Sequence, residues 1–368
     1  MSTLRLVLGS LAVALAASLP ADRATADDFP RLTGLSYGRL QFERTYRSDD
    51  PLREIDQLFI RATLNADLRL DPAWSIRTSL KFEPVIRTSD DRWLDGQGLW
   101  LEEAYLDWDG DRFGAFAGKF DPSFGFAFDR APVMFGRRLV EEYETAEKIG
   151  AGSRIKWRDG GGGRHALVAS VFFQDSTPLS QSAFYRPRFG DPRAFRPGRI
   201  RESDGGPSNT RSLESFTLTA VGQALGGPLD LRYSVGWRRQ RQGATETRDE
   251  DGLVAGAEWT WRLGGGVTLT PLVEYARFQD FEGADRTGQF LTGVAVFAMD
   301  GWSLATSATW KRVEDHATDS ARDDHVAMVA LGYTWPNGIG AEIGWKTERI
   351  RGIEGQAVGT LVRYRTRF

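Results

Sequence analysis

The stretch QLFIRATLNADLRL, residues 57–70, decides the fold because it reads with a period of two. Successive side chains of a strand point to opposite faces, whereas neighbours on one face of a helix lie three and four residues apart. The pattern therefore predicts a strand with one apolar and one polar face. The apolar positions are Leu58, Ile60, Ala62, Leu64, Ala66, Leu68 and Leu70, and they alternate with Gln57, Phe59, Arg61, Thr63, Asn65, Asp67 and Arg69.

The same alternation recurs to Phe368 and predicts sixteen strands. Their expected spans are 35–45, 55–69, 74–86, 99–108, 112–120, 147–158, 164–175, 213–224, 229–240, 252–262, 267–278, 288–298, 302–312, 325–335, 339–348 and 356–368. Glycine, proline, asparagine and aspartate mark the tight turns between them. These turns are expected at 70–72, 109–111, 160–163, 226–227, 264–266, 300–301 and 336–338.

Longer polar segments alternate with the tight turns. They are expected to form loops at 46–54, 87–98, 121–146, 176–212, 241–251, 279–287, 313–324 and 349–355. A meander with two unlike ends is typical of an antiparallel up-and-down transmembrane β-barrel with short periplasmic turns and long extracellular loops. An even number of strands also places both termini at the short-turn end.

Composition excludes several other classes. The 368 residues include no cysteine, which excludes a disulfide scaffold, a thiolate metal site and a cysteine nucleophile. A net charge of -3 argues against nucleic-acid binding. The mean hydropathy is -0.38, and no apolar run beyond the first twenty residues approaches the length of a spanning helix.

The first 26 residues are predicted to be a signal peptide. Arg5 precedes an apolar run at 6–19, and Ala24-Thr25-Ala26 matches a small-x-small cleavage site. The alternative is a buried first helix. Cleavage would leave an exported barrel of residues 27–368.

Tryptophans fall near the predicted strand ends, on the apolar face. Amphipathic rings at both rims of a barrel form girdles at the depth of the lipid headgroups. The alternative is a soluble sandwich or propeller, but arginines recur on the opposite face and no blade-length repeat is visible. The tryptophans assigned to this face are Trp74, Trp100, Trp108, Trp157, Trp237, Trp259, Trp261, Trp302, Trp310, Trp335 and Trp345.

The signal peptide, the sixteen alternating strands and the terminal VRYRTRF, residues 362–368, resemble a Gram-negative outer-membrane porin of the general or substrate-selective type. The resemblance implies a water-filled channel for passive diffusion of small polar solutes and ions. It also implies a homotrimer embedded in outer-membrane lipid and lipopolysaccharide. A terminal Phe368 resembles the signal that the barrel assembly machinery reads.

The third long loop, 121–146, is expected to fold into the barrel and set a constriction, as the loop at this place does in porins. Its apolar residues are too many to leave in water. They are Phe124, Phe126, Phe128, Val133, Met134 and Phe135. Its candidate constriction residues are Arg130, Arg137, Arg138, Glu141, Glu142 and Glu144. The alternative is a loop lying outside in water.

Charges on the polar face predict the selectivity, because rings of charged side chains bias ion passage. Basic residues outnumber acids there, which favours anions and suggests the phosphate-selective porins as relatives. The predicted channel-lining residues are Arg39, Arg61, Arg77, Lys81, Glu103, Lys119, Arg154, Lys156, Arg232 and Arg238. Two alternatives stay open: these charges pair across strands, and the arginines of loop 176–212 contact lipopolysaccharide.

An enzyme is the second class considered, since His316 and His325 lie among Asp, Ser and Thr residues. No Gly-x-Ser-x-Gly stretch accompanies them, so catalysis is not predicted, and no cofactor is implied. The acids between Glu314 and Asp324 are expected to bridge divalent ions loosely rather than build a metal site. A closed structural or adhesive barrel is the remaining alternative.

Overall fold

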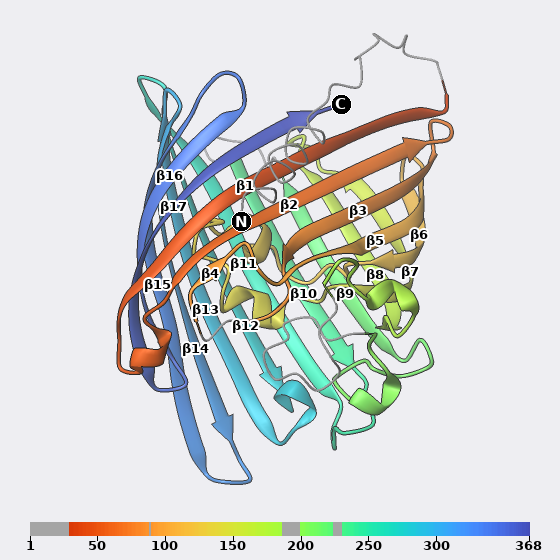
Figure 1. Cartoon of the computed structure of the whole chain (residues 1–368). Helices are drawn as coiled ribbons and strands as arrows, with labels where there is room; N and C mark the ends of the chain where they lie inside the picture. The colour runs from red at the N-terminus through yellow and green to blue at the C-terminus, as the bar shows by residue number, and fades with distance from the viewer. Residues whose placement is uncertain (1–28, 88–89, 186–198, 224–229) are drawn as a thin grey trace.

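The computed structural model describes residues 29–87, 90–185, 199–223 and 230–368, and it is a closed antiparallel β-barrel (Figure 1). Within these residues sixteen long strands follow one another around the wall. They are β1 (Arg31–Ser48), β2 (Asp56–Arg69), β3 (Trp74–Pro84), β5 (Gln97–Asp109), β6 (Phe113–Phe120), β7 (Lys148–Arg158), β8 (Arg164–Gln174), β9 (Ser215–Gln223), β10 (Asp230–Gln240), β11 (Glu250–Gly264), β12 (Val267–Gln279), β13 (Arg286–Met299), β14 (Trp302–Asp315), β15 (Ser320–Thr334), β16 (Ile339–Ile350) and β17 (Ile353–Arg367). The predicted fold class is confirmed.

The barrel closes where β1 pairs with β17, in a register that runs from Leu35 opposite Arg367 to Ser48 opposite Gly355. Just beyond this ladder, the backbone N–H of Gly34 donates to the Phe368 carbonyl at 2.9 Å, and the Phe368 N–H donates back at 3.2 Å. A side chain at position 34 would collide with the Phe368 ring, so glycine allows the terminal aromatic to lie across the seam. The start of β1 and the C-terminal Phe368 therefore lie at the short-turn end, as predicted for the barrel.

The two faces of the wall differ as the alternation predicts. On β12, Val273 and Tyr275 are exposed on the outer face, whereas Leu272, Glu274 and Ala276 are buried on the inner face. Outward apolar side chains of this kind recur on strand after strand around the barrel. They give the barrel an apolar outer surface, which is unfavourable in water. None of the helices in the described part of the chain is long and apolar enough to cross a bilayer.

Two of the predicted long loops are instead tight hairpins. β14 continues to Asp315 and β15 begins at Ser320, while only two residues separate β16 from β17. Charged residues pair across the first of these hairpins: Arg312 on β14 lies 3.7 Å from Asp323 on β15. Segments 313–324 and 349–355 looked like loops because they are charged, but paired charges are compatible with strands.

The predicted loop 87–98 contains a short strand, β4 (Arg92–Trp93), which pairs in parallel with β2 at Gln57 and Leu58. The β2–β3 ladder extends only to Ala62 opposite Phe82. Between Asp56 and Ala62 the edge of β2 is therefore not paired with β3, and β4 pairs with part of this free edge. Residues 88–89, 186–198 and 224–229, which carry parts of three predicted connections, lie outside the described residues.

The prediction that Trp100 belongs to an outer girdle is wrong. The side chain is 7% exposed and lies on the inner face, on the same side as Lys81, its register partner on β3. The cause is a bulge opposite Ser79 and Leu80, which shifts the alternation of β5 by one residue. Trp74, Trp157, Trp237, Trp302 and Trp335 are exposed near strand ends.

Leu64 and Asn65 test the assignment of the two faces. Asn65 shares the parity of Arg61, and Leu64 has the opposite parity. We expect Leu64→Arg to destabilise the folded barrel by about 2–4 kcal/mol, because it places a charge in lipid, while Asn65→Arg is nearly neutral. Unfolding in urea, followed by the heat-modifiable gel shift, measures both. Equal losses for the two variants would contradict the register.

Candidate functional site

The segment 121–147 leaves the wall after β6 and returns at β7. Its two ends are tied to each other and to β5. The backbone N–H of Glu147 donates to the Asp121 carboxylate at 2.7 Å, and the Asp121 N–H donates to Glu103 Oε1 at 3.2 Å. Between these ends lie the short helices α2 (Ala127–Arg130) and η2 (Val140–Tyr143), which Figure 1 shows within the ring of strands.

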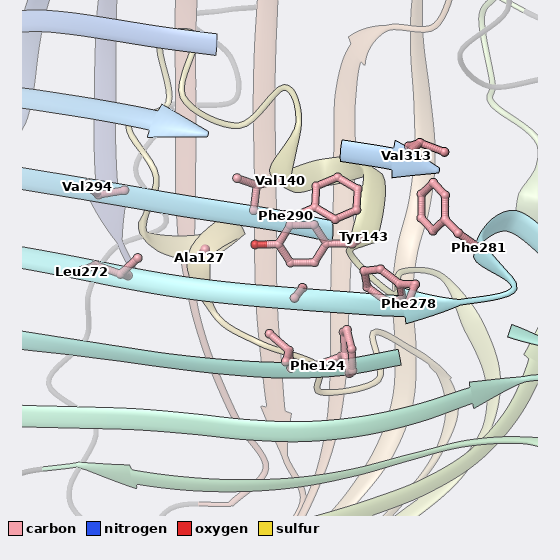
Figure 2. Close-up of a cluster of buried hydrophobic side chains, with 12 residues drawn as sticks. Phe124, Ala127, Val140, Tyr143, Leu272, Phe278, Phe281, Phe290, Val294 and Val313 are labelled. Carbon is pink, nitrogen blue, oxygen red and sulfur yellow. The ribbon is translucent and has the colours of Figure 1, made fainter. Parts of the chain in front are cut away.

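The beginning and the end of the segment pack against the inner faces of β11 to β14. Figure 2 shows Phe124 and Tyr143 turned toward Phe278 and Phe290, with ring centroids of Tyr143 and Phe290 4.9 Å apart. Phe126 and Phe128 pack at the edge of this cluster. Burying one such ring contributes about 1.5–3 kcal/mol, so several together hold the segment to the wall.

A second cluster holds the middle of the segment against β15 and β17, farther along the wall toward the β1–β17 seam. Met134 and Phe135 are buried against Met328 and Leu361 of β15 and β17, with Val133 beside them. The backbone of Gly344 lies so close to Met134 that a side chain there would stand 2.5 Å from the Met134 sulfur. A segment that packs on β12 and on β17 lies inside the barrel.

The carboxylate of Glu274, on β12, anchors the segment by hydrogen bonds. It accepts from the backbone N–H of Phe126 at 2.7 Å, from the N–H of Ala127 at 3.2 Å and from the Tyr143 hydroxyl at 2.7 Å. Glu274 is 1% exposed, and a buried carboxylate needs such donors. Burial and the nearby Glu274 raise the pKa of Tyr143, which therefore keeps its donating proton.

Arg238 on β10 is a second anchor rather than an open channel residue. It is 3% exposed, pairs with Glu250 at 2.7 Å and donates to the Tyr143 carbonyl and to Thr145 Oγ1, each at 2.7 Å. Its guanidinium also lies 4.7 Å from the Phe124 ring. Both terminal nitrogens of Arg238 are therefore engaged by the segment and by Glu250, and the side chain anchors the segment.

Three charged residues of the segment reach different strands. Arg130 pairs with Glu258 at 3.5 Å, and Arg138 pairs with Glu348 at 3.0 Å. Glu142 pairs with Lys311. These contacts, on β11, β16 and β14, spread the segment across the lumen.

Arg137, Glu141 and Glu144, the other candidate constriction residues, form no ion pair among the described residues. Arg137 stacks over Phe128 at 4.7 Å, and Glu141 is exposed within electrostatic range of Arg61. Burial raises the pKa of Glu144 to about 8, although Lys81 opposes the shift. The open edge of the segment therefore presents both signs of charge.

Several predicted wall residues are ion-paired across strands. Arg77 pairs with Asp107 at 2.8 Å, and Arg154 bridges Asp107 and Asp109. Lys156 also pairs with Asp109, at 2.8 Å. One acid, Asp107, which is 1% exposed, thus serves two arginines on two strands. These residues therefore follow the alternative interpretation of the sequence, in which the charges of the inner wall pair across strands.

Three further predicted residues are compensated in other ways. Lys81 pairs with Glu102, and Arg232 pairs with Glu258 at 3.5 Å. Lys119 is 2% exposed and lies between Glu147 at 3.0 Å and Asp175 at 2.8 Å, so it does not face a water-filled path.

Glu102 is a residue that sequence reasoning missed. The β5 bulge turns it inward beside Glu103, which alternation alone would forbid. A bulge leaves little trace in a sequence, since the residues on either side still alternate. The described residues contain no group of three or more His, Asp or Glu side chains arranged to hold a metal ion.

One place on the inner wall has an excess of positive charge. Arg39 on β1 stands directly opposite Arg61 on β2 and Arg363 on β17. Arg61 pairs with Glu83 at 3.1 Å and Arg363 with Glu342 at 3.2 Å. Arg39 has no carboxylate partner among the described residues, and its nearest charges include Arg61 and Arg137. We call Arg363, Arg39 and Arg61 the arginine row.

The arginine row destabilises the pairing of β17, β1 and β2, because like charges directly opposite each other on neighbouring strands repel. Arg39 is nevertheless 7% exposed, and its Nε atom has no hydrogen-bond partner. Arg39 lies beside the Tyr37 phenol but has no carboxylate partner among the described residues, and a buried cation needs a compensating charge. An anion in the lumen would supply it.

No protein-family model and no curated protein matches this sequence. Solved structures of outer-membrane proteins share the fold. OmpT of Vibrio cholerae, with loop L8 deleted, has a TM-score of 0.56 at 10% identity, covering 91% of this chain and 99% of that one. OmpT has also been solved in a trimer form, with a TM-score of 0.50.

Two further solved structures share the fold, one described as an outer membrane channel and one solved with a small molecule. The outer membrane channel DcaP of Acinetobacter baumannii has a TM-score of 0.55 at 13% identity, covering 91% of this chain and 96% of that one. OpdK of Pseudomonas aeruginosa, solved with vanillate, has a TM-score of 0.52 at 9% identity, covering 92% and 99%. At these identities the likeness establishes the fold alone: a closed antiparallel β-barrel like those of the solved outer-membrane proteins.

Glu274→Ala tests whether the anchor holds the segment inside. The variant leaves three donors without their acceptor, each at about 1–3 kcal/mol, so we expect the segment to leave the lumen more often. Trypsin is too large to enter the barrel and cleaves after Arg137 or Arg138 only when the segment emerges. We expect faster cleavage in Glu274→Ala.

Glu282→Ala is the matched control. The Glu282 side chain, on the same side of the barrel, pairs with Arg286 at 3.7 Å and, among the described residues, with none of 121–147. Its backbone N–H donates to Glu250 at 2.8 Å, a bond that alanine retains. Its cleavage rate should equal that of the unmodified protein. Identical rates in all three proteins would show that Glu274 does not hold the segment.

Proposed function

We propose that the protein is an outer-membrane porin, a water-filled channel for passive diffusion of small polar solutes and ions. One observation carries the proposal: a charged segment is fixed across the lumen of a barrel whose outer face is apolar. A closed structural barrel would gain stability from an apolar plug, whereas here charged side chains such as Arg61 and Glu141 remain exposed inside.

The segment 121–147 is the proposed constriction. Its apolar side is used in packing, so its polar edge is what a passing solute meets. Arg137 and Glu141 stand on that edge, near Arg39 and Arg61 of the opposite wall. Such a mixed field favours ions and small polar solutes over apolar ones.

The proposed bias toward anions rests on the arginine row and not on the whole basic wall. Arg77, Lys81, Arg154 and Lys156 are each neutralised by an acid, so they contribute little net field. Arg39 lacks such an acid among the described residues. The phosphate-selective subtype is not argued further, because no observation distinguishes phosphate from other anions.

The proposal includes a location and partners. The apolar outer face suits outer-membrane lipid and lipopolysaccharide, and a cleaved signal peptide at 1–26 would account for export; those residues lie outside the described part of the chain. Phe368 closes the seam and is proposed to be read by the barrel assembly machinery. A homotrimer is proposed, supported by the trimer form of OmpT.

We also propose that the protein is not an enzyme. His316 Nε2 lies 2.9 Å from the Thr287 hydroxyl. Within the described residues, however, no carboxylate contacts the other ring nitrogen. A hydroxyl nucleophile needs a base that is itself oriented by a third group.

The anion bias is tested by Arg39→Gln with Arg61→Gln in planar bilayers. We expect the reversal potential under a KCl gradient to shift toward cations. The shift should be largest near 0.01 M salt, where the Debye length is about 30 Å. Arg349→Gln, an exposed arginine on the outer face of β16, is the control and should behave as the unmodified channel. An unchanged reversal potential in the double variant would show that the arginine row does not influence the passing ions.

A further inference from the structure

The outer face of the barrel carries a pocket of about 820 Å³ at the long-loop end, over β10 to β13. Its lower edge is apolar: Trp237 is 42% exposed and Leu253 is 61% exposed. Tyr275 and Leu291 continue the apolar surface just below it, one outward position nearer the middle of the barrel. The pocket therefore lies half within the apolar belt.

The upper part of the pocket is lined by charges of both signs, Arg248, Arg277 and Arg286 together with Asp251, Asp280 and Asp285. Arg277 projects outward from β12, level with Trp237 and Leu253 through their shared register, and Arg248 and His316 reach in from the connections above. An apolar floor beneath guanidinium groups suits an amphiphile with an anionic head, rather than a soluble anion that would leave the floor in contact with water.

The acids of the pocket pair with cations other than Arg277. Arg248 pairs with Asp280 at 3.1 Å and with Asp285 at 2.9 Å. Asp251 lies 3.9 Å from Arg239. Among the described residues no hydrogen bond or ion pair is formed by the Arg277 guanidinium, although the acids beside it are within the same pocket. Its five donors are thus available to a ligand.

We infer that this pocket binds the phosphorylated sugar head of lipid A, with the Arg277 guanidinium on a phosphate and the acyl chains along Trp237, Leu253 and Tyr275. Three observations carry the inference: the free guanidinium, the neutralised acids and the apolar floor at the same level. A phosphorylated disaccharide and a pocket of this volume are of compatible size. The inference rests on the proposed function, which places this end of the barrel in the outer leaflet.

Native mass spectrometry of the detergent-solubilised full-length protein tests it. The probe is diphosphoryl lipid A, compared with the same glycolipid lacking both phosphates and with phosphatidylglycerol. We expect diphosphoryl lipid A to bind at least tenfold more tightly than either, as a charge-assisted bond to phosphate requires. Equal binding of the dephosphorylated glycolipid, or of phosphatidylglycerol, would overturn the inference without any variant.

Arg277→Gln locates the site. We expect its affinity for diphosphoryl lipid A to fall about tenfold, while its affinity for the dephosphorylated form stays the same. Arg349→Gln is the matched control, since Arg349 also projects outward near the long-loop end but lies outside the pocket. Unchanged affinity in Arg277→Gln would overturn the inference.

The failure of this inference and the failure of the proposed function are distinguishable. Arg277 lies on the outer face, so Arg277→Gln should conduct ions as the unmodified protein does. A protein that binds phosphorylated lipid A through Arg277 but shows no conductance would refute the channel and retain the lipid site. A protein that conducts ions but shows no preference for phosphorylated lipid A would retain the channel and refute the lipid site.

Discussion

The burial of one segment against the inner wall is the constraint on which the interior of this barrel depends. Strand pairing closes the wall, but it leaves a lumen whose inner face is partly apolar between β11 and β14. The segment 121–147 covers that apolar area and brings backbone donors to the buried Glu274 carboxylate. Neither partner is satisfied alone: Glu274 would be an unpaired buried charge, and Phe124 and Tyr143 would face water.

The charges of the lumen are mostly paired within the wall. Basic residues such as Arg77 and Arg154 have an acid of a nearby strand within reach, and pairing removes most of their long-range field. The arginine row differs because its three members face one another across β17, β1 and β2. A local excess of charge at a narrowing biases passage more than the total charge of the wall does, which is why the proposed anion bias is assigned to the surroundings of Arg39.

Much of the fold was predictable because a barrel has one rule, the period of two, and the rule extends through every strand. Both misplaced loops were charged segments, and the period continues through them in the paired hairpins at 313–324 and 349–355. Trp100 and Glu102 could not be placed, since a bulge at β5 changes which parity faces inward. The candidate site was predictable as a list of charged residues, but not as a set of pairs. Pairing between Arg77 and Asp107, or between Glu274 and Tyr143, depends on distances that residue spacing does not contain.

The central claim is that segment 121–147 narrows a channel that the barrel would otherwise leave wide. Single-channel conductance of a variant lacking residues 126–138 tests it most directly. The strands keep their own hydrogen bonds without these residues, so the barrel should fold and its conductance should rise severalfold. A folded variant whose conductance equals that of the unmodified protein would contradict the claim.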